Sequence, residues 1–477
     1  MKAGSRHPKS SDRSHDLNYR YSDLGDLQSA LRDGTTSSVE IAHEALRLLA
    51  DLAPTYNALA NLLPERAIAD AERADRRLRR GDSSRLCGIP YAAKDLFAAR
   101  GGPTSWGSST FADQVIDQDA DVVSRLAKAG AVLVAKTSMS ELAGGGRPAK
   151  PGASMHGSGI NPWASDRYSG GSSSGSAIAV ALGLVPYGLG TETGGSVLGP
   201  AAYSGVTGIR PTAGNISKSG AMTLSWTLDK IGVLARTAKT CADVLAALLD
   251  HPWRRRFRKE LANPLEPRGL RMGVSPSIID ECSPGIRPAI EKGLGDLEEL
   301  GVALVETELS RDSSVVDAVE LIIQVEGAHE FAHWLRAGSL DMTDEKQLAN
   351  LKRGLEVLAM DYLDALRQTT AEARRSFDGL FAEVDVVVAA SRVDDAPHLD
   401  RPRAPRDPNK QSDLLRAAGN LAGVPGVSMP CGLSVDGLPV GLQIVGARNS
   451  EATLLRLTAL YQSATNHHER RPPERTT

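Results

Sequence analysis

Two clusters of glycine and serine, separated by an apolar run, constrain the fold of this 477-residue chain more than any other feature. The first cluster is Gly170-Gly-Ser-Ser-Ser-Gly-Ser176 and the second is Gly190-Thr-Glu-Thr-Gly-Gly-Ser196. Glycines at this density allow positive φ angles and let the backbone approach a ligand closely, while serines supply nucleophiles or proton relays. A flexible linker would share this composition. Residues 178–187 between the clusters are too apolar for a solvated tether, so the clusters indicate a buried site built from close backbone turns.

Lys94 stands at the end of an upstream apolar segment, Gly88-Ile-Pro-Tyr-Ala-Ala-Lys94-Asp95. A lysine chosen at random is most often a surface residue whose head group reaches water. Here the short apolar approach predicts a buried strand that delivers Lys94 to a desolvated site. Burial lowers the pKa of a lysine, and a neutral lysine can act as a base. Lys94 is therefore the candidate base beside the serine clusters.

In combination these segments resemble the amidase signature family. The family pattern is G-G-S-S-x-G-S, a buried helix and strand, and then G-T-[DE]-x-G-G-S, with a lysine upstream in an apolar-K-D context. The resemblance implies an α/β amidase signature fold, in which a large mixed β-sheet core is flanked by helices on both faces. It also implies a Ser-cisSer-Lys triad, with Ser196 as the nucleophile, Ser172 as the bridging serine and Lys94 as the base. In the family mechanism Lys94 takes a proton from Ser172, which takes one from Ser196, and the same relay returns a proton to the departing amine.

The backbone around Ser196 is a candidate oxyanion hole, which stabilises the negative charge that develops during amide hydrolysis. Ser196 lies where a glycine-rich turn meets an expected helix start. The N–H groups of Thr193, Gly194, Gly195 and Ser196 are therefore expected to converge on one anion. A side chain at Gly194 or Gly195 would block either the turn or the substrate.

The segments that match the family predict a single domain over residues 21–465, because they run from about residue 38 to residue 455 without a linker-like break. The match thins between about residues 251 and 380. The charged ends, residues 1–20 and 466–477, are expected to be disordered tails. Near the N-terminus, Ser37-Ser-Val-Glu40 is a capping box that predicts the start of a helix ending near Pro54.

The composition limits which partners, which cofactors and which cellular compartment we expect for this chain. The net charge is −3 and the pI is about 6.4, so overall charge does not predict binding to nucleic acid or to an anionic membrane. The ten histidines show no metal-ligand spacing such as H-E-x-x-H, so neither a metal nor another cofactor is expected. The cysteines form no C-x-x-C pair and are expected to be free, buried thiols of a reducing compartment: Cys87, Cys241, Cys282 and Cys431. We therefore expect a cytoplasmic protein whose partner is a small-molecule amide or carbamate, with a homodimer left open.

A rival motif overlaps the first cluster. Gly171-Ser-Ser-Ser-Gly175 satisfies G-x-S-x-G, the nucleophile elbow of α/β-hydrolases, with Ser173 as the nucleophile. That motif requires a strand directly before it, and Ser165-Asp-Arg-Tyr-Ser169 is not strand-like. It also requires a downstream Asp and His, for which the sequence offers candidates but no pattern. We therefore place the nucleophile at Ser196.

The sequence says less about the substrate than about the type of reaction. We expect a free-standing amidase that cleaves a C–N bond of a small amide, aryl amide or carbamate through an acyl-enzyme on Ser196, which makes the chain a urethanase candidate. The pocket is expected to draw on Met139, Leu142, Gly171 and Trp226, together with the poorly matching middle segment.

Two other functions stay open. One is the glutaminase (A) subunit of the tRNA-dependent amidotransferase, against which two departures argue: Val197-Leu198 replaces its usual Ile-Arg, and residues 322–331 replace a segment rich in Tyr, Ser and Asn. The other is a non-catalytic, amidase-like binding scaffold. A scaffold predicts the loss of at least one triad residue, and Lys94, Ser172 and Ser196 are all present.

Two serine substitutions separate the triad from the elbow. Ser196→Ala should abolish hydrolysis and leave the fold intact, because it removes the attacking hydroxyl. Ser173→Ala should keep measurable activity, because the resemblance gives Ser173 no place in the relay. Turnover of an amide by each purified variant, with folding checked by circular dichroism, measures both effects. Turnover by Ser196→Ala above about 1% of wild type would overturn the assignment, since even the loss of one oxyanion donor costs about 100-fold.

Overall fold

The computed structural model describes residues 19–144, 152–308, 314–401 and 410–474. Within these ranges eleven strands form one sheet in the order β1-β3-β2-β4-β6-β5-β10-β11-β9-β7-β8. The strands are β1 (Leu59–Leu62), β2 (Pro90–Lys94), β3 (Val132–Thr137), β4 (Tyr187–Glu192), β5 (Thr207–Arg210), β6 (Lys230–Ala235), β7 (Arg271–Val274), β8 (Ala303–Glu306), β9 (Val386–Ala390), β10 (Gly426–Leu433) and β11 (Pro439–Gly446). Strand β2 pairs in parallel with β3 and β4, whereas β4 and β5 pair with β6 in antiparallel fashion. The large mixed sheet that the sequence predicts is therefore confirmed.

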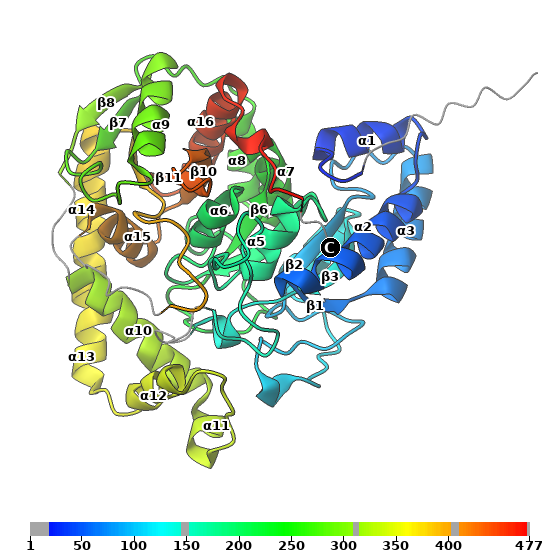
Figure 1. The fold of residues 1–477 in the computed structure, drawn as a ribbon, viewed down its shortest axis with the longest axis horizontal. Helices are drawn as coiled ribbons and strands as arrows, with labels where there is room; N and C mark the ends of the chain where they lie inside the picture. The colour runs from blue at the N-terminus through cyan, green and yellow to red at the C-terminus, as the bar shows by residue number, and fades with distance from the viewer. Residues whose placement is uncertain (1–18, 145–151, 309–313, 402–409, 475–477) are drawn as a thin grey trace, which may run out of the picture.

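Helices cover both faces of this sheet, as predicted (Figure 1). They are α1 (Leu24–Arg32), α2 (Ser38–Leu52), α3 (Pro64–Arg79), α4 (Asp121–Lys128), α5 (Ser174–Ala181), α6 (Leu198–Ser204), α7 (Ala238–Leu248), α8 (Trp253–Leu261), α9 (Arg287–Glu299), α10 (Ser314–Glu330), α11 (Ala332–Ala337), α12 (Glu345–Gly354), α13 (Ala359–Asp364), α14 (Thr370–Glu383), α15 (Gln411–Ala422) and α16 (Glu451–Ala464). The helix and the strand expected between the two Gly/Ser clusters are α5 and β4. Helices α5 and α6 lie side by side over the centre of the sheet.

Glycines bring α5 and α6 close to the sheet. Gly188 and Gly190 of β4 are two residues apart, so both leave the same face of the strand without a side chain. A Cβ at Gly188 would lie 3.1 Å from a side-chain atom of α5, and one at Gly208 of β5 would lie 2.7 Å from a side-chain atom of α6. On the opposite face, Gln462 of α16 donates a hydrogen bond to the hydroxyl of Thr207 at 2.9 Å. The glycine-rich face therefore holds both Gly/Ser clusters against the sheet.

The ends of β2 and β3 carry a buried ion pair. Asp95 directly follows β2, and Lys136 lies in β3. Lys136 Nζ lies 2.8 Å from Asp95 Oδ1 and donates to Thr104 Oγ1 at 2.9 Å. The second carboxylate oxygen of Asp95 accepts hydrogen bonds from the N–H and the hydroxyl of Ser105 at 2.8 and 2.5 Å. These contacts fix the end of β2, where Lys94 precedes Asp95.

The folded domain begins before residue 21 and ends after residue 465, which were the expected boundaries. Tyr19 is buried, and its hydroxyl donates to the carbonyl of Leu184 at 2.9 Å. Near the other end a 3₁₀ helix spans His467–Glu469, and His467 is buried 3.6 Å from Asp296. Residues 19–20 and 466–474 are thus part of the folded domain, because these side chains find partners in its core. Residues 1–18 and 475–477 lie outside the described ranges.

Two local predictions are confirmed. Ser37 and Glu40 form a reciprocal capping box at the N-terminus of α2, and that helix ends at Leu52, two residues before Pro54. All four cysteines are free and buried.

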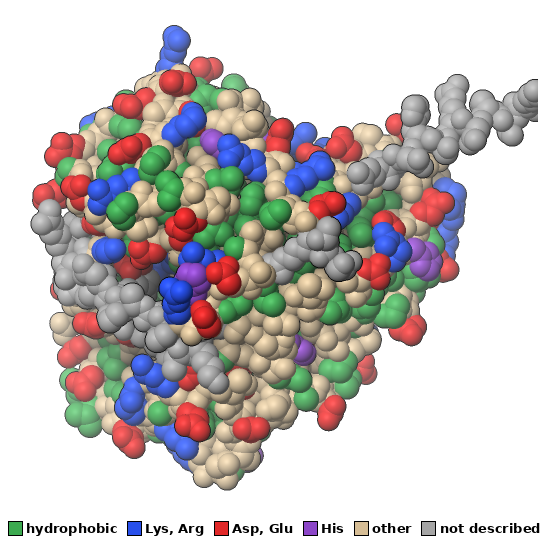
Figure 2. Space-filling view, in the orientation of Figure 1, with side chains coloured by type: hydrophobic (Ala, Val, Ile, Leu, Met, Phe, Trp, Pro, Cys, Tyr) green, Lys and Arg blue, Asp and Glu red, His purple; other side chains and the backbone are tan. Residues whose placement is uncertain are grey.

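The described part of the chain contains no helix that is long and apolar enough to cross a membrane. Over the face drawn in Figure 2, Lys and Arg side chains are interspersed with Asp and Glu side chains. In the same described ranges no group of three or more His, Cys, Asp and Glu side chains is placed to hold a metal ion.

Removing one partner of the Asp95–Lys136 pair should destabilise the fold. Lys136→Met should lower the free energy of unfolding by about 3–5 kcal/mol, because it leaves the carboxylate of Asp95 buried without its counter-charge. The double variant Asp95→Asn/Lys136→Met should regain part of the loss, because neither charge is then buried. Denaturant unfolding of the three proteins measures the effect. A single variant as stable as wild type would show that the pair does not secure the end of β2.

Candidate active site

Lys94 ends β2 in the interior of the molecule, in contact with two hydroxyl groups. Its side chain is 0% exposed, and Nζ lies 2.7 Å from Ser172 Oγ and 2.9 Å from Thr191 Oγ1. Thr191 belongs to β4, the parallel neighbour of β2. Ser172 comes from the first Gly/Ser cluster. The fold therefore brings the candidate base into direct contact with the candidate bridging serine.

The surroundings of Lys94 favour its uncharged form. Burial lowers its pKa to about 7, and the attraction of Asp229 and Glu192 offsets this effect only in part. The atoms in contact with Nζ are neutral hydroxyls, which do not require a charged partner. The uncharged form of Lys94, whose lone pair can accept a proton, is therefore far more accessible near neutral pH than that of an ordinary lysine.

Ser172 is positioned by the backbone around it. The Gly171–Ser172 peptide bond is cis. The carbonyl of Ser172 accepts a hydrogen bond from the N–H of Ser140 at 3.2 Å. A Cβ at Gly171 would lie 2.1 Å from the hydroxyl of Tyr168, so the space beside this glycine is already filled. Gly171, expected to be a substrate contact, serves here to let the chain pass Tyr168.

Ser196 lies in the turn between β4 and α6 and is partly exposed. The N–H of Ser173 donates to the carbonyl of Ser196 at 3.2 Å, which sets the two Gly/Ser clusters side by side. Among the hydrogen bonds of the described ranges there is none between the hydroxyls of Ser172 and Ser196, and catalytic contacts are often long without a bound substrate. Of the expected relay, the contact between Lys94 and Ser172 is therefore formed, and Ser196 is partly exposed.

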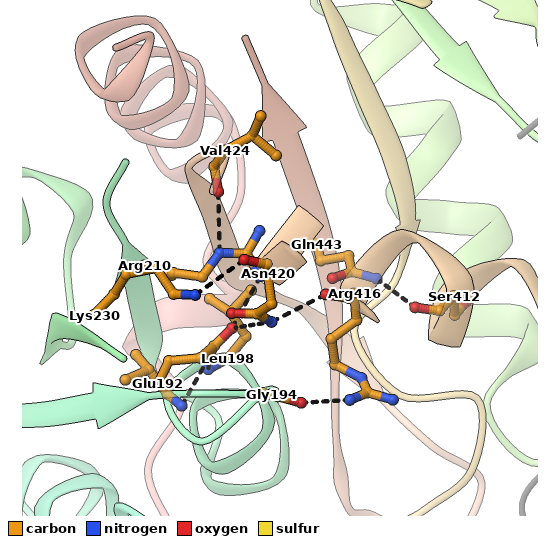
Figure 3. A network of polar contacts seen from close by, with 12 residues as sticks. Glu192, Gly194, Leu198, Arg210, Lys230, Ser412, Arg416, Asn420, Val424 and Gln443 are labelled. Atoms are coloured by element: carbon orange, nitrogen blue, oxygen red, sulfur yellow. Dashed lines mark hydrogen bonds and ion pairs between the residues drawn. The ribbon is translucent and has the colours of Figure 1, made fainter. Parts of the chain in front are cut away.

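A buried carboxylate caps helix α6. Glu192, the last residue of β4, accepts hydrogen bonds from the N–H groups of Val197 and Leu198, both at 2.9 Å (Figure 3). Arg210 lies 2.9 Å from its other oxygen, and Asn420 donates to that oxygen at 3.1 Å. Although burial raises the pKa of Glu192, Arg210 and the two N–H groups hold it below its usual range. The motif identified Glu192 only as an acidic position, because its contacts with Arg210 and Asn420 involve segments 18 and 228 residues away.

The turn that follows Glu192 has a local geometry suited to an oxyanion hole. The hydroxyl of Thr193 donates to Asp229 at 2.6 Å, which anchors the start of the turn. Gly195 has a φ of +124°, a conformation that favours glycine. Since Glu192 already binds the N–H groups that follow the turn, the candidate donors stay those of Thr193, Gly194, Gly195 and Ser196.

The rival nucleophile Ser173 is fully buried, and its hydroxyl is engaged by the backbone. Its Oγ donates to the carbonyl of Thr191 and accepts from the N–H of Thr191, both at 3.3 Å. Residues 169–173, which directly precede α5, contain no strand. The strand–turn–helix arrangement of a nucleophile elbow is therefore lacking at Ser173.

The other expected substrate contacts, Met139, Leu142 and Trp226, differ in their exposure. Met139 and Leu142 are 1% and 0% exposed and belong to the main hydrophobic core, because the segment after β3 runs into the interior. Trp226 is 44% exposed and meets His329 of α10 edge to face, with 5.4 Å between ring centroids.

Helix α10 instead supplies apolar side chains next to the turn. A Cβ at Gly194 would lie 3.6 Å from Ile323 Cδ1 and 3.8 Å from Val319 Cγ1. Both residues come from the middle of the chain, where the match to the family pattern thins. The expectation that this segment contributes to the site agrees with its position, but the sequence did not single out either residue.

A large cavity lies away from these residues. It has a volume of about 1070 Å³ and lies between α3, α4, α7 and α8, with Arg77, Arg125, Asp243 and Arg254 among its lining. It contains neither the Lys94–Ser172 contact nor the turn at Ser196. The candidate active site stays at the Lys94–Ser172 contact and the turn at Ser196, where the candidate base and nucleophile lie.

The comparisons with known proteins place the chain among the enzymes that hydrolyse C–N bonds of non-peptide amides. The chain belongs to the Amidase family, whose model matches residues 40–455.

Among curated proteins, it is 34% identical to the A subunit of Glutamyl-tRNA(Gln) amidotransferase from Coxiella burnetii (strain Dugway 5J108-111), over 94% of this chain and 98% of that protein. The identity to the corresponding protein of Methylococcus capsulatus (strain ATCC 33009 / NCIMB 11132 / Bath) is 36%, with the same coverage of 94% and 98%. Among solved structures, native peptide amidase from Stenotrophomonas maltophilia is 28% identical with a TM-score of 0.82, covering 96% of this chain and 99% of that one. The structure of 6-aminohexanoate cyclic dimer hydrolase is 25% identical with a TM-score of 0.81, covering 94% and 98%.

The activity should rise with pH through about 7, because only uncharged Lys94 can accept the proton of Ser172. Lys94→Arg should be inactive across this range, since arginine stays protonated in proteins. The pH–rate profile of the wild type beside the folded variant measures both.

Lys230 offers a matched control. It is also buried with a pKa lowered to about 7, but it donates to the carbonyl of Asn420. Lys230→Met should leave the midpoint in place, whereas near-normal turnover by folded Lys94→Arg would contradict the role as base.

Proposed function

We propose that the chain is a serine amidase in which Ser196 attacks the carbonyl carbon of an amide and Lys94 acts through Ser172 as the base. The observation that carries the proposal is the buried contact of 2.7 Å between Lys94 Nζ and Ser172 Oγ, at a lysine whose pKa is lowered to about 7. Lys136, the buried lysine of the adjacent strand, is instead paired with the carboxylate of Asp95.

In the first half of the reaction, Ser196 Oγ bonds to the carbonyl carbon. Its proton passes to Ser172, and the proton of Ser172 passes to Lys94. The carbonyl oxygen becomes an oxyanion, which the N–H groups of the turn from Thr193 to Ser196 stabilise. The C–N bond then breaks, the relay returns the proton to the leaving nitrogen, and the acyl group stays on Ser196 as an ester.

In the second half, a water molecule gives a proton to the same relay and attacks the ester carbon. The bond between the acyl group and Ser196 Oγ breaks, and Ser196 recovers its proton through Ser172. The products are a carboxylic acid and an amine or ammonia. No step requires a metal or another cofactor.

A glutaminase function is the second candidate, and the sequence comparisons favour it over a free-standing amidase. The relatives that are 34–36% identical are named as the A subunit of Glutamyl-tRNA(Gln) amidotransferase, and they match nearly end to end. In that role, the chain would release ammonia from glutamine and would work with partner proteins.

Local residues favour a free-standing amidase that acts on a small amide, aryl amide or carbamate with an apolar acyl group. Ile323 and Val319 of α10 lie next to Gly194, so apolar side chains border the turn. The arginine that usually follows the glutaminase motif is replaced by Leu198, which is buried. The solved structures most relevant to this candidate are the peptide amidase and the cyclic dimer hydrolase, both with the same fold.

A substrate panel with the purified chain separates these candidates. The panel contains L-glutamine, a primary aliphatic amide, an aryl amide such as a nitroanilide, and an aryl carbamate, with Ser196→Ala as the control. We expect Ser196-dependent release of ammonia or amine from at least one of them. Glutamine as the preferred substrate supports the glutaminase function, and preference for the apolar amides or the carbamate supports the free-standing amidase.

Labelling by a fluorophosphonate tests the mechanism without knowledge of the substrate. Wild type should be labelled once per chain at Ser196, and Ser196→Ala should not be labelled. A wild-type protein that neither reacts with the probe nor hydrolyses any member of the panel would support the binding scaffold instead.

A further inference from the structure

Two arginines donate hydrogen bonds to consecutive carbonyls of the turn that carries Ser196. Arg416 of α15 donates to the carbonyl of Gly194 (Figure 3). Arg392, two residues after the end of β9, donates to the carbonyl of Gly195 at 3.4 Å. No sequence motif identified either arginine, because each lies about 200 residues from the turn in the chain.

The planar geometry of the peptide bond links these contacts to the oxyanion hole. In a trans peptide the carbonyl and the following N–H point in opposite directions. A carbonyl of Gly194 that points to Arg416 therefore aims the N–H of Gly195 away from it. The carbonyl of Gly195 accepts from the N–H of Gly199 in α6 at 3.0 Å as well as from Arg392, so these two contacts together aim the N–H of Ser196 away from that arginine. These N–H groups are adjacent members of the proposed set of oxyanion donors.

The arginine side chains also close one side of the turn. A Cβ at Gly195 would lie 2.8 Å from Arg416 Cδ and 3.4 Å from Arg392 Nη2. A substrate cannot occupy this space, so it must meet the turn from the side to which the N–H groups point. The arginines thus act from behind the turn and do not touch the substrate.

Arg416 is itself held in a fixed position. It is buried, and its Nη2 lies 2.5 Å from Asp413 Oδ1, one helical turn earlier in α15. Asn420, one turn later in α15, donates to Glu192 at the start of the same catalytic turn. Positions 413, 416 and 420 share one face of the helix, so α15 holds both the capping carboxylate and the carbonyl of Gly194.

We propose that Arg416 and Arg392 are positioning residues that aim the N–H groups of Gly195 and Ser196 at the oxyanion. This inference rests on the proposed function, in which Ser196 is the nucleophile. It adds a cause for the orientation of the turn, which the Gly/Ser motif alone does not specify.

The test compares Arg416→Met, Arg392→Met and Arg416→Lys with wild type, using p-nitrophenyl acetate as an activated acyl donor and a fluorophosphonate as a label. Each Met variant should lower kcat and the rate of labelling by about 10- to 100-fold, less than the loss of a donor, because the N–H groups remain but are aimed less well. The KM should change by less than about threefold, since the arginines do not contact the substrate. Arg416→Lys should recover part of the rate, because an ammonium group can still donate to the carbonyl of Gly194.

Arg456→Met is the matched control. Arg456 also donates to two backbone carbonyls, those of Glu260 and Asn263, at a place remote from the turn. Arg456→Met should lower the unfolding temperature as the loss of a buried arginine does in Arg416→Met, but it should keep the wild-type kcat. A kcat that falls as much in Arg456→Met as in Arg416→Met would assign the effect to general stability and overturn the proposal.

Folded Arg416→Met and Arg392→Met variants with a kcat within about twofold of wild type would also overturn it. If Arg416→Met does not fold, Arg392→Met and Arg416→Lys decide by the same criterion. Failure of the proposed function has a different signature, because Ser196→Ala would then still react with the label. An unreactive Ser196→Ala beside fully active arginine variants would refute only the positioning role.

Discussion

Glu192 and Arg210 are both fully buried, and the 2.9 Å contact between them allows a carboxylate to stay charged at the centre of the protein. A buried ion pair offsets its desolvation only when hydrogen bonds satisfy the remaining polar atoms. Here those bonds come from the first N–H groups of α6 and from Asn420. The turn that carries Ser196 runs from Glu192 to the helix that Glu192 caps, so one carboxylate fixes both of its ends. The same contacts join β4, β5, α6 and α15, which makes the catalytic turn dependent on segments far apart in the chain.

Two buried lysines in neighbouring strands show how contacts set the charge of a group. Lys136 lies 2.8 Å from the carboxylate of Asp95, which opposes the lowering of its pKa by burial. Lys94, at the end of the adjacent strand, instead donates through Nζ to the hydroxyls of Ser172 and Thr191. Burial lowers the pKa of both lysines, and that of Lys94 is lowered to about 7. The first arrangement suits a structural role, and the second suits a proton acceptor.

The part of the chain that departs most from the family pattern lies next to the catalytic turn. Helix α10 brings Ile323 and Val319 to Gly194. The buried carboxylate of Glu326 in the same helix accepts hydrogen bonds from Thr227 at 2.5 and 3.1 Å. Asp229, two residues after Thr227, accepts a hydrogen bond from Thr193 in the turn. Changes in α10 can therefore alter the surroundings of a bound acyl group without changing Lys94, Ser172 or Ser196.

The sequence by itself determined the family and the candidate catalytic residues, because each of them stands in a short motif. The serine clusters, the helix and strand between them, and the apolar strand before Lys94 follow from local composition and periodicity, which act over a few residues. Only the tertiary structure decided which partners surround these motifs. It showed Glu192 as the cap of α6, brought Arg392 and Arg416 to the turn, and buried Met139 and Leu142 in the core. The physical reason is that burial, charge compensation and the aim of a backbone N–H depend on contacts between segments some 200 residues apart, and no local pattern encodes those contacts.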